Sequence, residues 1–123
     1  MRLLVCGDRN WKDYSAILAK INEMAPEVVI EGEARGADLM ARRAAEKLGI
    51  PVLKFSAEWD AYGRAAGFIR NQQMLIEGKP DYVLAFHDDI ENSRGTKDMV
   101  QRAEKAGIQV EVWSHLNLNE EEE

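Results

Sequence analysis

The sequence predicts an α/β protein: a three-layer Rossmann-like fold around a five-stranded parallel sheet. Short apolar runs alternate with stretches of helical period, which is typical of βαβ units. The runs are continuous and rich in β-branched residues, as expected of strands buried on both faces. A length of 123 residues fits one domain with one core.

Two strand–helix units are expected in the first 48 residues. Strands over residues 3–6 and 28–30 precede helices over 14–24 and 37–48. The second helix has apolar residues at the spacing of an amphipathic helix. These residues are Ala37, Met40, Ala41, Ala44, Ala45 and Leu48.

The remaining elements expected are strands over residues 51–55, 82–86 and 110–112 and helices over 64–77 and 96–106. The connection over residues 56–63 is the longest segment without a regular pattern. Long ordered loops in α/β domains are often functional. Trp59 and Tyr62 in this connection either stack on a base or anchor the loop.

Two strand orders fit these elements, 3-2-1-4-5 and the flavodoxin-like 2-1-3-4-5. We favour the first, because the long third connection can cross to the far side of the first strand. A ligand is then expected at the switch point, over the loops that follow strands one and four.

The charge balance argues against a protein that holds DNA. The chain has 16 Lys and Arg against 22 Asp and Glu, a formal net charge of −6, and residues 120–123 are all Glu. We expect residues 1–116 to form a single domain and residues 117–123 to be an acidic, disordered tail. Neither part has the basic excess of a duplex-DNA binder.

The sequence predicts neither a membrane span nor a signal peptide, and this favours the cytoplasm. Cys6 has no second cysteine to pair with and is expected to pack in the core. The acidic residues after His87 lack the spacing of a metal-ligand set, and no motif indicates a metal or a resident cofactor. His115 is expected to have no partner.

Three loops carry Gly and Arg at the predicted ligand edge of the sheet. They contribute Gly7 and Arg9, then Gly32, Arg35 and Gly36, and finally Arg94, Gly95 and Thr96. Two of these loops open helices, whose N-termini attract phosphate. Thr96 is expected to cap its helix, and Asp38 to compensate the dipole of its own helix rather than to catalyse. Arg70 and Asn71 add polar side chains on the third helix.

These motifs resemble the SLOG superfamily, which includes the DNA-processing protein DprA and the Lonely Guy cytokinin-activating enzymes. Within it, the sequence is most similar to the YspA-like branch found in bacteria and phages. The motifs span residues 5–9, 32–38, 67–74 and 94–98. The resemblance implies a Rossmann-like fold with a pocket for nucleotides or nucleotide-derived ligands. Glu33 stands where this branch usually has Gly.

The resemblance also suggests a reaction. In Lonely Guy enzymes, a helix Arg and an acidic residue after a Gly-Thr pair support cleavage of the N-glycosidic bond of nucleoside 5′-monophosphates. Arg70 matches the first of these, and Asp98 is the nearest match to the second. The carboxylate would stabilise an oxocarbenium-like sugar or orient water.

Three functions therefore compete. The first is binding of a nucleotide-like phosphate ligand, as a sensor or in conflict between phage and host. The second is phosphoribohydrolase activity with Asp98 and Arg70 as catalytic residues. The third is DprA-like binding of single-stranded DNA, against which the charge balance argues. A homodimer is also considered, with Phe68, Leu75 and Trp113 as its apolar patch.

Overall fold

One parallel sheet forms the centre of the protein. In this computed structural model, which describes residues 1–116, the strands are β1 (Arg2–Gly7), β2 (Val28–Glu31), β3 (Val52–Lys54), β4 (Tyr82–Phe86) and β5 (Gln109–Trp113). Their order is β3-β2-β1-β4-β5, and every pairing is parallel. The predicted 3-2-1-4-5 order is confirmed, and the flavodoxin-like alternative is wrong. The predicted tail, residues 117–123, lies outside the described residues.

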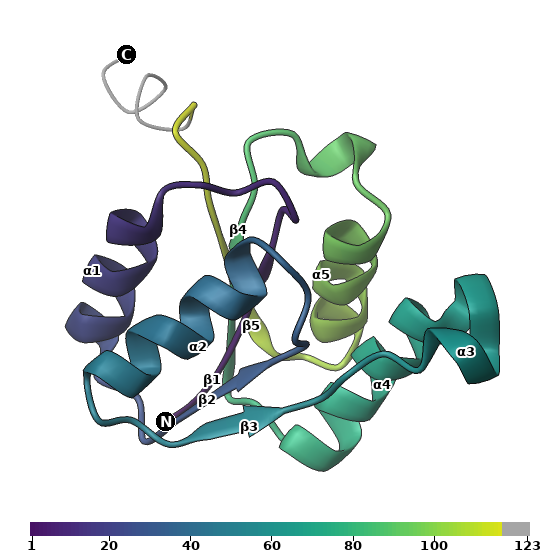
Figure 1. Ribbon diagram of the computed structural model, residues 1–123, viewed down its shortest axis with the longest axis horizontal. Helices are drawn as coiled ribbons and strands as arrows, with labels where there is room; N and C mark the ends of the chain where they lie inside the picture. The colour runs from purple at the N-terminus through teal and green to yellow at the C-terminus, as the bar shows by residue number, and fades with distance from the viewer. Residues whose placement is uncertain (117–123) are drawn as a thin grey trace.

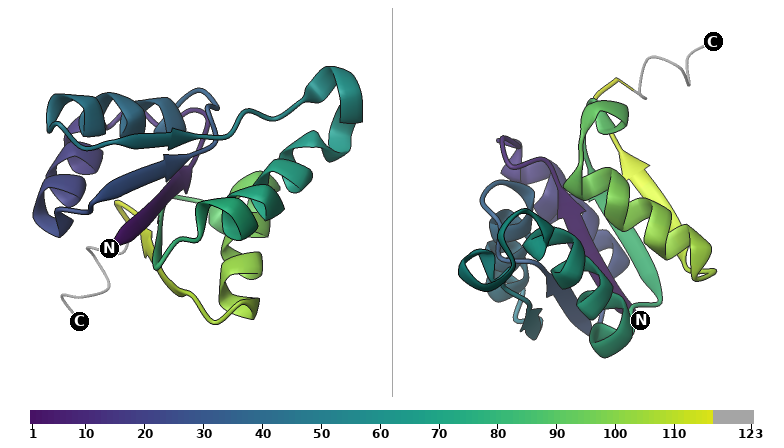
Figure 2. Two further views of the ribbon diagram at one scale, coloured as in Figure 1. Left: turned by 90° about the horizontal axis from the view of Figure 1, so that it is seen from below. Right: turned by 90° about the vertical axis from the view of Figure 1, so that its right-hand side faces the viewer.

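Helices cover both faces of the sheet, which gives the three predicted layers (Figure 1). The helices are α1 (Tyr14–Met24), α2 (Ala37–Lys47), α3 (Trp59–Tyr62), α4 (Ala66–Gly78) and α5 (Gly95–Lys105). Helices α1 and α2 pack together on one face, and α4 and α5 pack together on the other. Two further views show that α3 stands out beyond the sheet (Figure 2).

Two clusters of buried apolar residues, one on each face of the sheet, make up the core, and the apolar runs of the sequence supply both. Residues of β1 alternate between the faces, so Leu3 and Val5 pack under α1 and α2 while Leu4 and Cys6 pack under α4 and α5. Because β1 is central, neighbouring strands and helices bury these residues completely or nearly so. Strand β1, whose carboxyl end lies at the predicted ligand edge of the sheet, is therefore packed on all sides.

Two local predictions are wrong. The connection over residues 56–63 is not wholly irregular, since it contains α3 and leads into a 3-10 turn at Gly63–Ala65, so that α4 begins at Ala66. Thr96 does not cap α5, because it is a buried residue of the first turn. The hydroxyl of Ser93 accepts the hydrogen bond from the Lys97 N–H at 3.0 Å instead.

Glycines allow the loops at the ligand edge to pack closely. A Cβ on Gly7 would lie 2.3 Å from the carbonyl oxygen of Phe86, and one on Gly36 would lie 2.3 Å from that of Asp8. Gly36 also has a φ of +79°, which side chains disfavour. These two positions bring the loop after β1 against the start of α2.

The apolar patch expected for a dimer is not present as predicted. Leu75 packs against the core under α4 and α5, and Trp113 packs against Trp11 with ring centroids 5.7 Å apart. Only Phe68 of the three is exposed. No helix within residues 1–116 is long and apolar enough to cross a membrane.

Candidate functional site

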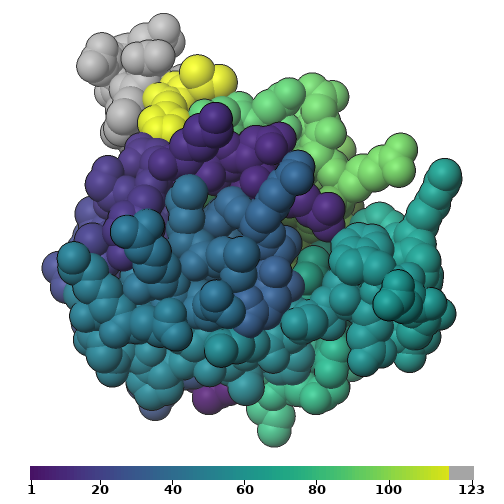
Figure 3. Space-filling view, in the orientation of Figure 1, coloured from purple at the N-terminus to yellow at the C-terminus, as the bar shows by residue number. Residues whose placement is uncertain are grey.

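A cavity of about 740 Å³ lies at the carboxyl ends of β1 and β4, the predicted switch point. In the space-filling view its mouth lies between the loop after β1, coloured purple, and the teal and green segments of α4 and the start of α5 (Figure 3). Its lining comes from the loop after β1, the start of α2, α3 and α4, and the start of α5. All of these walls except the one from α3 come from strand ends or helices that the sequence pattern predicts.

Arg70 is the buried cation of this cavity, with 8% of its surface exposed. Its Nε donates to Asn71 Oδ1 at 3.1 Å, and its Nη1 donates to the carbonyl oxygen of Gly32. Burial lowers the pKa of Arg70, although Asp38 opposes that shift. A guanidinium remains charged at neutral pH, so the cavity holds a fixed positive charge.

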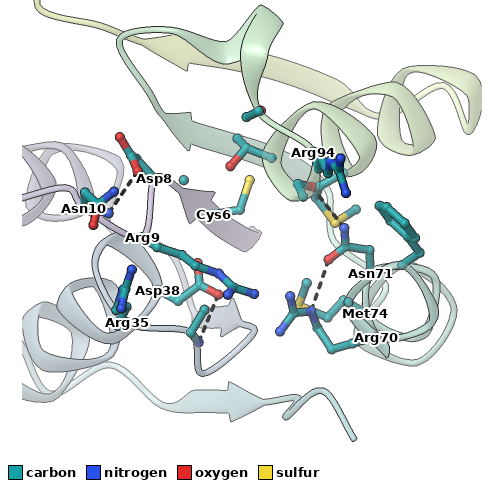
Figure 4. Close-up of a pocket in the computed structure, with 18 of the residues that line it drawn as sticks. Cys6, Asp8, Arg9, Asn10, Arg35, Asp38, Arg70, Asn71, Met74 and Arg94 are labelled. Carbon is teal, nitrogen blue, oxygen red and sulfur yellow. Dashed lines mark hydrogen bonds between the residues drawn. The ribbon is translucent and has the colours of Figure 1, made fainter. Parts of the chain in front are cut away.

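Arg9 faces Arg70 across the cavity. The two side chains reach from opposite sides toward one space, Arg9 from the loop after β1 and Arg70 from α4 (Figure 4). The Arg9 guanidinium carbon lies 5.3 Å from the centroid of the Trp59 ring, in a cation–π contact. Trp59 therefore holds Arg9 at the cavity wall. The two roles considered from the sequence were stacking on a base and anchoring the loop, so this contact is a third.

Asp38 is the buried carboxylate of the cavity, with 5% of its surface exposed. Its Oδ2 accepts a hydrogen bond from the Ala34 N–H at 3.3 Å. Burial raises the pKa of Asp38 to about 6, although the positive charges of Arg70 and Arg9 oppose the rise. Asp38 lies in the first turn of α2, as the helix-dipole interpretation requires, and it also borders the cavity.

Gly32 lies between these charged groups. A Cβ at this position would be 2.6 Å from Arg70 Nη1 and 2.9 Å from Asp38 Oδ2. Only a residue without a side chain leaves Arg70 and Asp38 where they are. Gly32, expected from the sequence as a phosphate-binding residue, therefore makes room for these two side chains.

The rim of the cavity is also basic. Arg35, Arg64 and Arg94 border it with exposed side chains, in addition to Arg9 and Arg70. Among residues 1–116, none of these arginines has a carboxylate within the 4.0 Å of an ion pair. The cavity thus concentrates unpaired positive charge in an acidic protein.

Asp98, predicted as a catalytic residue, does not border the cavity. Its Oδ2 accepts hydrogen bonds from Asn71 Nδ2 at 3.0 Å and from Arg102 Nε at 2.7 Å. It therefore lies between α4 and α5, in the lining of a separate groove. The same Asn71 amide donates to the carbonyl oxygen of Gly95 at 3.1 Å, so Asn71 connects the cavity wall to α5.

The other predicted site residues are brought together. Those that border the main cavity are Gly7, Arg9, Arg35, Arg70, Asn71, Arg94, Gly95 and Thr96. Gly32 borders a smaller pocket beside it. Gly36 borders neither and acts through the backbone packing already described.

The two helix starts differ in what they offer to an anion. At α2, the Ala37 N–H donates to the carbonyl oxygen of Asp8 and the Leu39 N–H to that of Ala34, each at 3.1 Å. At α5, Gly95 and Thr96 precede the first intrahelical bond, from the Asp98 N–H to the Arg94 carbonyl, and both border the cavity. At the start of α5, the Gly95 and Thr96 amides therefore lie at the cavity and ahead of the hydrogen bonds of the helix.

Glu33 borders the smaller pocket, and its charge is paired. It has a φ of +59°, a conformation that favours glycine, and its carboxylate pairs with Arg42 Nη1 at 3.0 Å. The neighbouring Glu31 is fully buried, and its Oε1 accepts from the Glu33 N–H at 2.7 Å. Burial raises the pKa of Glu31 to about 8. Its Oε2 has no hydrogen-bond partner among the residues that the structure describes.

Sequence reasoning missed several features of this edge. Arg64 and Met74 border the cavity, and nothing in their local pattern distinguishes them from residues of the helix surface or core. His115, expected to be alone, bridges Asp13 and Asp88 at 2.8 and 2.9 Å and stacks on Trp11. Within the described part of the chain, no group of three or more His, Cys, Asp or Glu side chains could hold a metal ion.

Comparison with a solved structure supports the fold. The chain superimposes on the X-ray structure of DNA processing protein A (DprA) from Streptococcus pneumoniae with a TM-score of 0.72 at 19% sequence identity. The match covers 90% of this chain and 49% of the DprA chain, so the protein spans about half the length of that relative.

Comparison of sequences supports the family. The chain is 37% identical over 119 residues to the Gene 61 protein of Mycobacterium phage D29, a match that covers 89% of this chain and 93% of the phage protein. Residues 1–62 match the YspA, cpYpsA-related SLOG family. This range contains β1, β2, β3, α1 and α2, and it includes Arg9 and Asp38 of the cavity but not Arg70 or Arg94. The chain belongs to the YspA, cpYpsA-related SLOG family.

Proposed function

We propose that the protein binds a nucleotide or nucleotide-derived phosphate ligand in the main cavity. The observation that carries this proposal is the pairing of Arg70 with Arg9 across the cavity, neither of them neutralised by an ion pair among residues 1–116. Facing guanidinium groups repel each other, and a phosphate between them relieves that repulsion. Membership of a SLOG family is consistent with a nucleotide-related ligand.

The cavity also has surface for a base and a sugar. Trp59, Phe68, Met74 and Met99 contribute apolar area, and Asp38 contributes a carboxylate that can accept a hydroxyl hydrogen bond. A ligand with a phosphate, a ribose and a base uses all three kinds of surface. A role as a sensor, or in conflict between phage and host, is a wider proposal; the relative in Mycobacterium phage D29 shows only that a similar protein occurs in a phage.

The hydrolase alternative has weaker support. Asp98 is held by Asn71 and Arg102 and borders a different groove, so it does not present a carboxylate to a ligand in the cavity. DprA-like binding of single-stranded DNA has no support beyond a shared fold.

A thermal-shift screen against nucleoside 5′-mono-, di- and triphosphates tests the proposal. A ligand at 100 times its dissociation constant adds about 2.7 kcal/mol of stability, which raises the melting temperature by several degrees. Arg9→Ala is expected to remove most of the shift. The matched control is Arg43→Ala, because Arg43 stacks on Tyr14, 4.3 Å from the ring centroid and outside the cavity lining.

The proposal fails if no nucleotide shifts the wild-type protein, or if Arg9→Ala and Arg43→Ala behave alike. The same nucleotides, incubated with the protein and analysed for free base, test hydrolysis separately. Release of base that Asp98→Asn abolishes would restore the hydrolase alternative.

A further inference from the structure

We infer that the ligand carries a pyrophosphate group, held across two adjoining compartments that share Arg9, Arg35 and Arg70. This inference rests on the proposed function. The first compartment is the cavity of about 740 Å³, and the second is a pocket of about 380 Å³ beside it. The chemical class is therefore a nucleoside 5′-diphosphate or a nucleotide that contains that group, rather than a monophosphate.

The two compartments share a wall. Arg9, Ala34, Arg35, Trp59 and Arg70 border both. The wall is held together by the cation–π contact of Arg9 with Trp59 and by the hydrogen bond of Arg70 with Gly32. Three guanidinium groups thus lie at the junction, where each can donate to an anion on either side.

The second compartment lies at the carboxyl ends of β2 and β3. Four residues border the second compartment but not the first: Gly32, Glu33, Ser56 and Ala57. Glu33 is its one acidic residue, and that carboxylate already pairs with Arg42 at 3.0 Å. The small side chains of Ser56 and Ala57 leave room for a compact polar group such as a phosphate.

The net positive charge of the cavity lining is larger than the negative charge of one phosphate. Five arginines border the main cavity against Asp8 and Asp38, an excess of three positive charges. A phosphate monoester carries about −1.5 to −2 at neutral pH, and a second phosphate adds about one further negative charge. This count takes Asp38 as ionised; where Asp38 is protonated, the excess rises to four. A pyrophosphate balances the arginines more closely than a single phosphate does.

Two backbone amides beside this junction already have partners. The Ala37 and Leu39 N–H groups at the start of α2 already donate to backbone carbonyls. The guanidinium groups of Arg9, Arg35 and Arg70 can hold a second phosphate on this side through bidentate contacts.

Isothermal titration of the full chain with the mono- and diphosphate of one nucleoside tests the inference, with inorganic phosphate and pyrophosphate as further probes. The diphosphate is expected to bind at least tenfold more tightly than the monophosphate, and pyrophosphate more tightly than phosphate. Ala57→Phe fills the second compartment and is expected to weaken diphosphate binding at least tenfold, which brings the two nucleotides to similar affinity. Glu58→Phe is the matched control, one residue further on and bordering neither compartment.

Equal affinity of the wild-type protein for the mono- and diphosphate overturns the inference and leaves the proposed function standing. An equal loss for both nucleotides in Ala57→Phe also overturns it, because the second compartment then has no separate role. Binding of no nucleotide at all is the failure of the proposed function itself.

Discussion

Arg70 Nη1 donates a hydrogen bond to the carbonyl oxygen of Gly32 and thereby joins α4 to the loop that follows β2. Its Nε donates to Asn71, which in turn reaches α5 through Gly95. Three segments of the chain thus position the guanidinium in the ligand-free structure, as a site for the proposed ligand requires. Such preorganisation reduces the entropy lost on binding.

Gly32→Ala should weaken both nucleotide binding and folding stability. The new Cβ would lie 2.6 Å from Arg70 Nη1, so the guanidinium must move away from the cavity wall. We expect nucleotide affinity to fall at least tenfold in a titration, with a loss of about 1–3 kcal/mol of folding stability from overpacking.

Gly49→Ala is the control for that variant. Gly49 has a φ of +72° and open space around its Cβ position, and it is distant from the cavity lining. It should lose about 1–2 kcal/mol of stability from backbone strain while its nucleotide affinity stays at the wild-type value. If Gly32→Ala also binds nucleotide as the wild type does, the close approach of Gly32 to Arg70 has no part in binding.

Asp38→Asn should tighten binding of a phosphate ligand at pH 7.5, because it removes a negative charge beside Arg9 and Arg70. The pKa of Asp38 is raised by burial to about 6, so the wild-type carboxyl becomes neutral below that pH. The ratio of the two affinities should therefore be largest above pH 7 and approach one near pH 5. Both proteins are titrated with the same ligand at each pH. Protonation of the ligand's phosphate then affects both affinities equally and cancels in their ratio. A ratio that is constant with pH would show that Asp38 does not face the ligand.

Glu31 should make the protein less stable as the pH rises. Burial raises its pKa from 4.5 to about 8 in the folded state, so the folded protein keeps a proton that the unfolded chain releases. This contribution is fully present below pH 4.5 and is lost as the pH rises through 8. Urea unfolding at several pH values should show a decline over this range that is flatter in Glu31→Gln. An equally steep decline in the variant would assign the pH dependence to other groups.

His115 should titrate above its ordinary pKa. Hydrogen bonds to Asp13 and Asp88 raise the pKa of His115, because both carboxylates favour the protonated ring. NMR titration of the ring protons should show a midpoint above 6.5, and Asp88→Asn should lower it. A midpoint that Asp88→Asn leaves in place would mean that this bridge does not form in solution.

The strand order, and the edge of the sheet at which the cavity lies, could be predicted from the sequence for a physical reason. Local patterns determine where the strands lie, and the length of the connection after β3 allows only a few crossings. The helix of residues 14–24 can be predicted from its apolar stripe, and the structure adds that Asp13 accepts a hydrogen bond from the Ala16 N–H at its start.

The direction in which an individual side chain points, and the partners that it contacts, could not be predicted in the same way. Asp98 follows Thr96 by two residues, about 200° around the helix, so it faces Arg102 when Thr96 faces the cavity. His115 is 27 and 102 positions from its two partners, and no local pattern carries such contacts. The capping role expected of Thr96 falls to Ser93, because α5 begins one residue earlier than its apolar stripe indicates.

Calorimetric titration of one nucleoside 5′-diphosphate into the wild-type protein and into Arg70→Gln tests the central claim most directly. The wild type should bind one ligand per chain, and a folded Arg70→Gln should bind it at least a hundredfold more weakly, with Arg43→Gln as the control. Equal affinity in a folded Arg70→Gln, or no heat of binding with the wild type, would contradict the assignment of this cavity as a phosphate site.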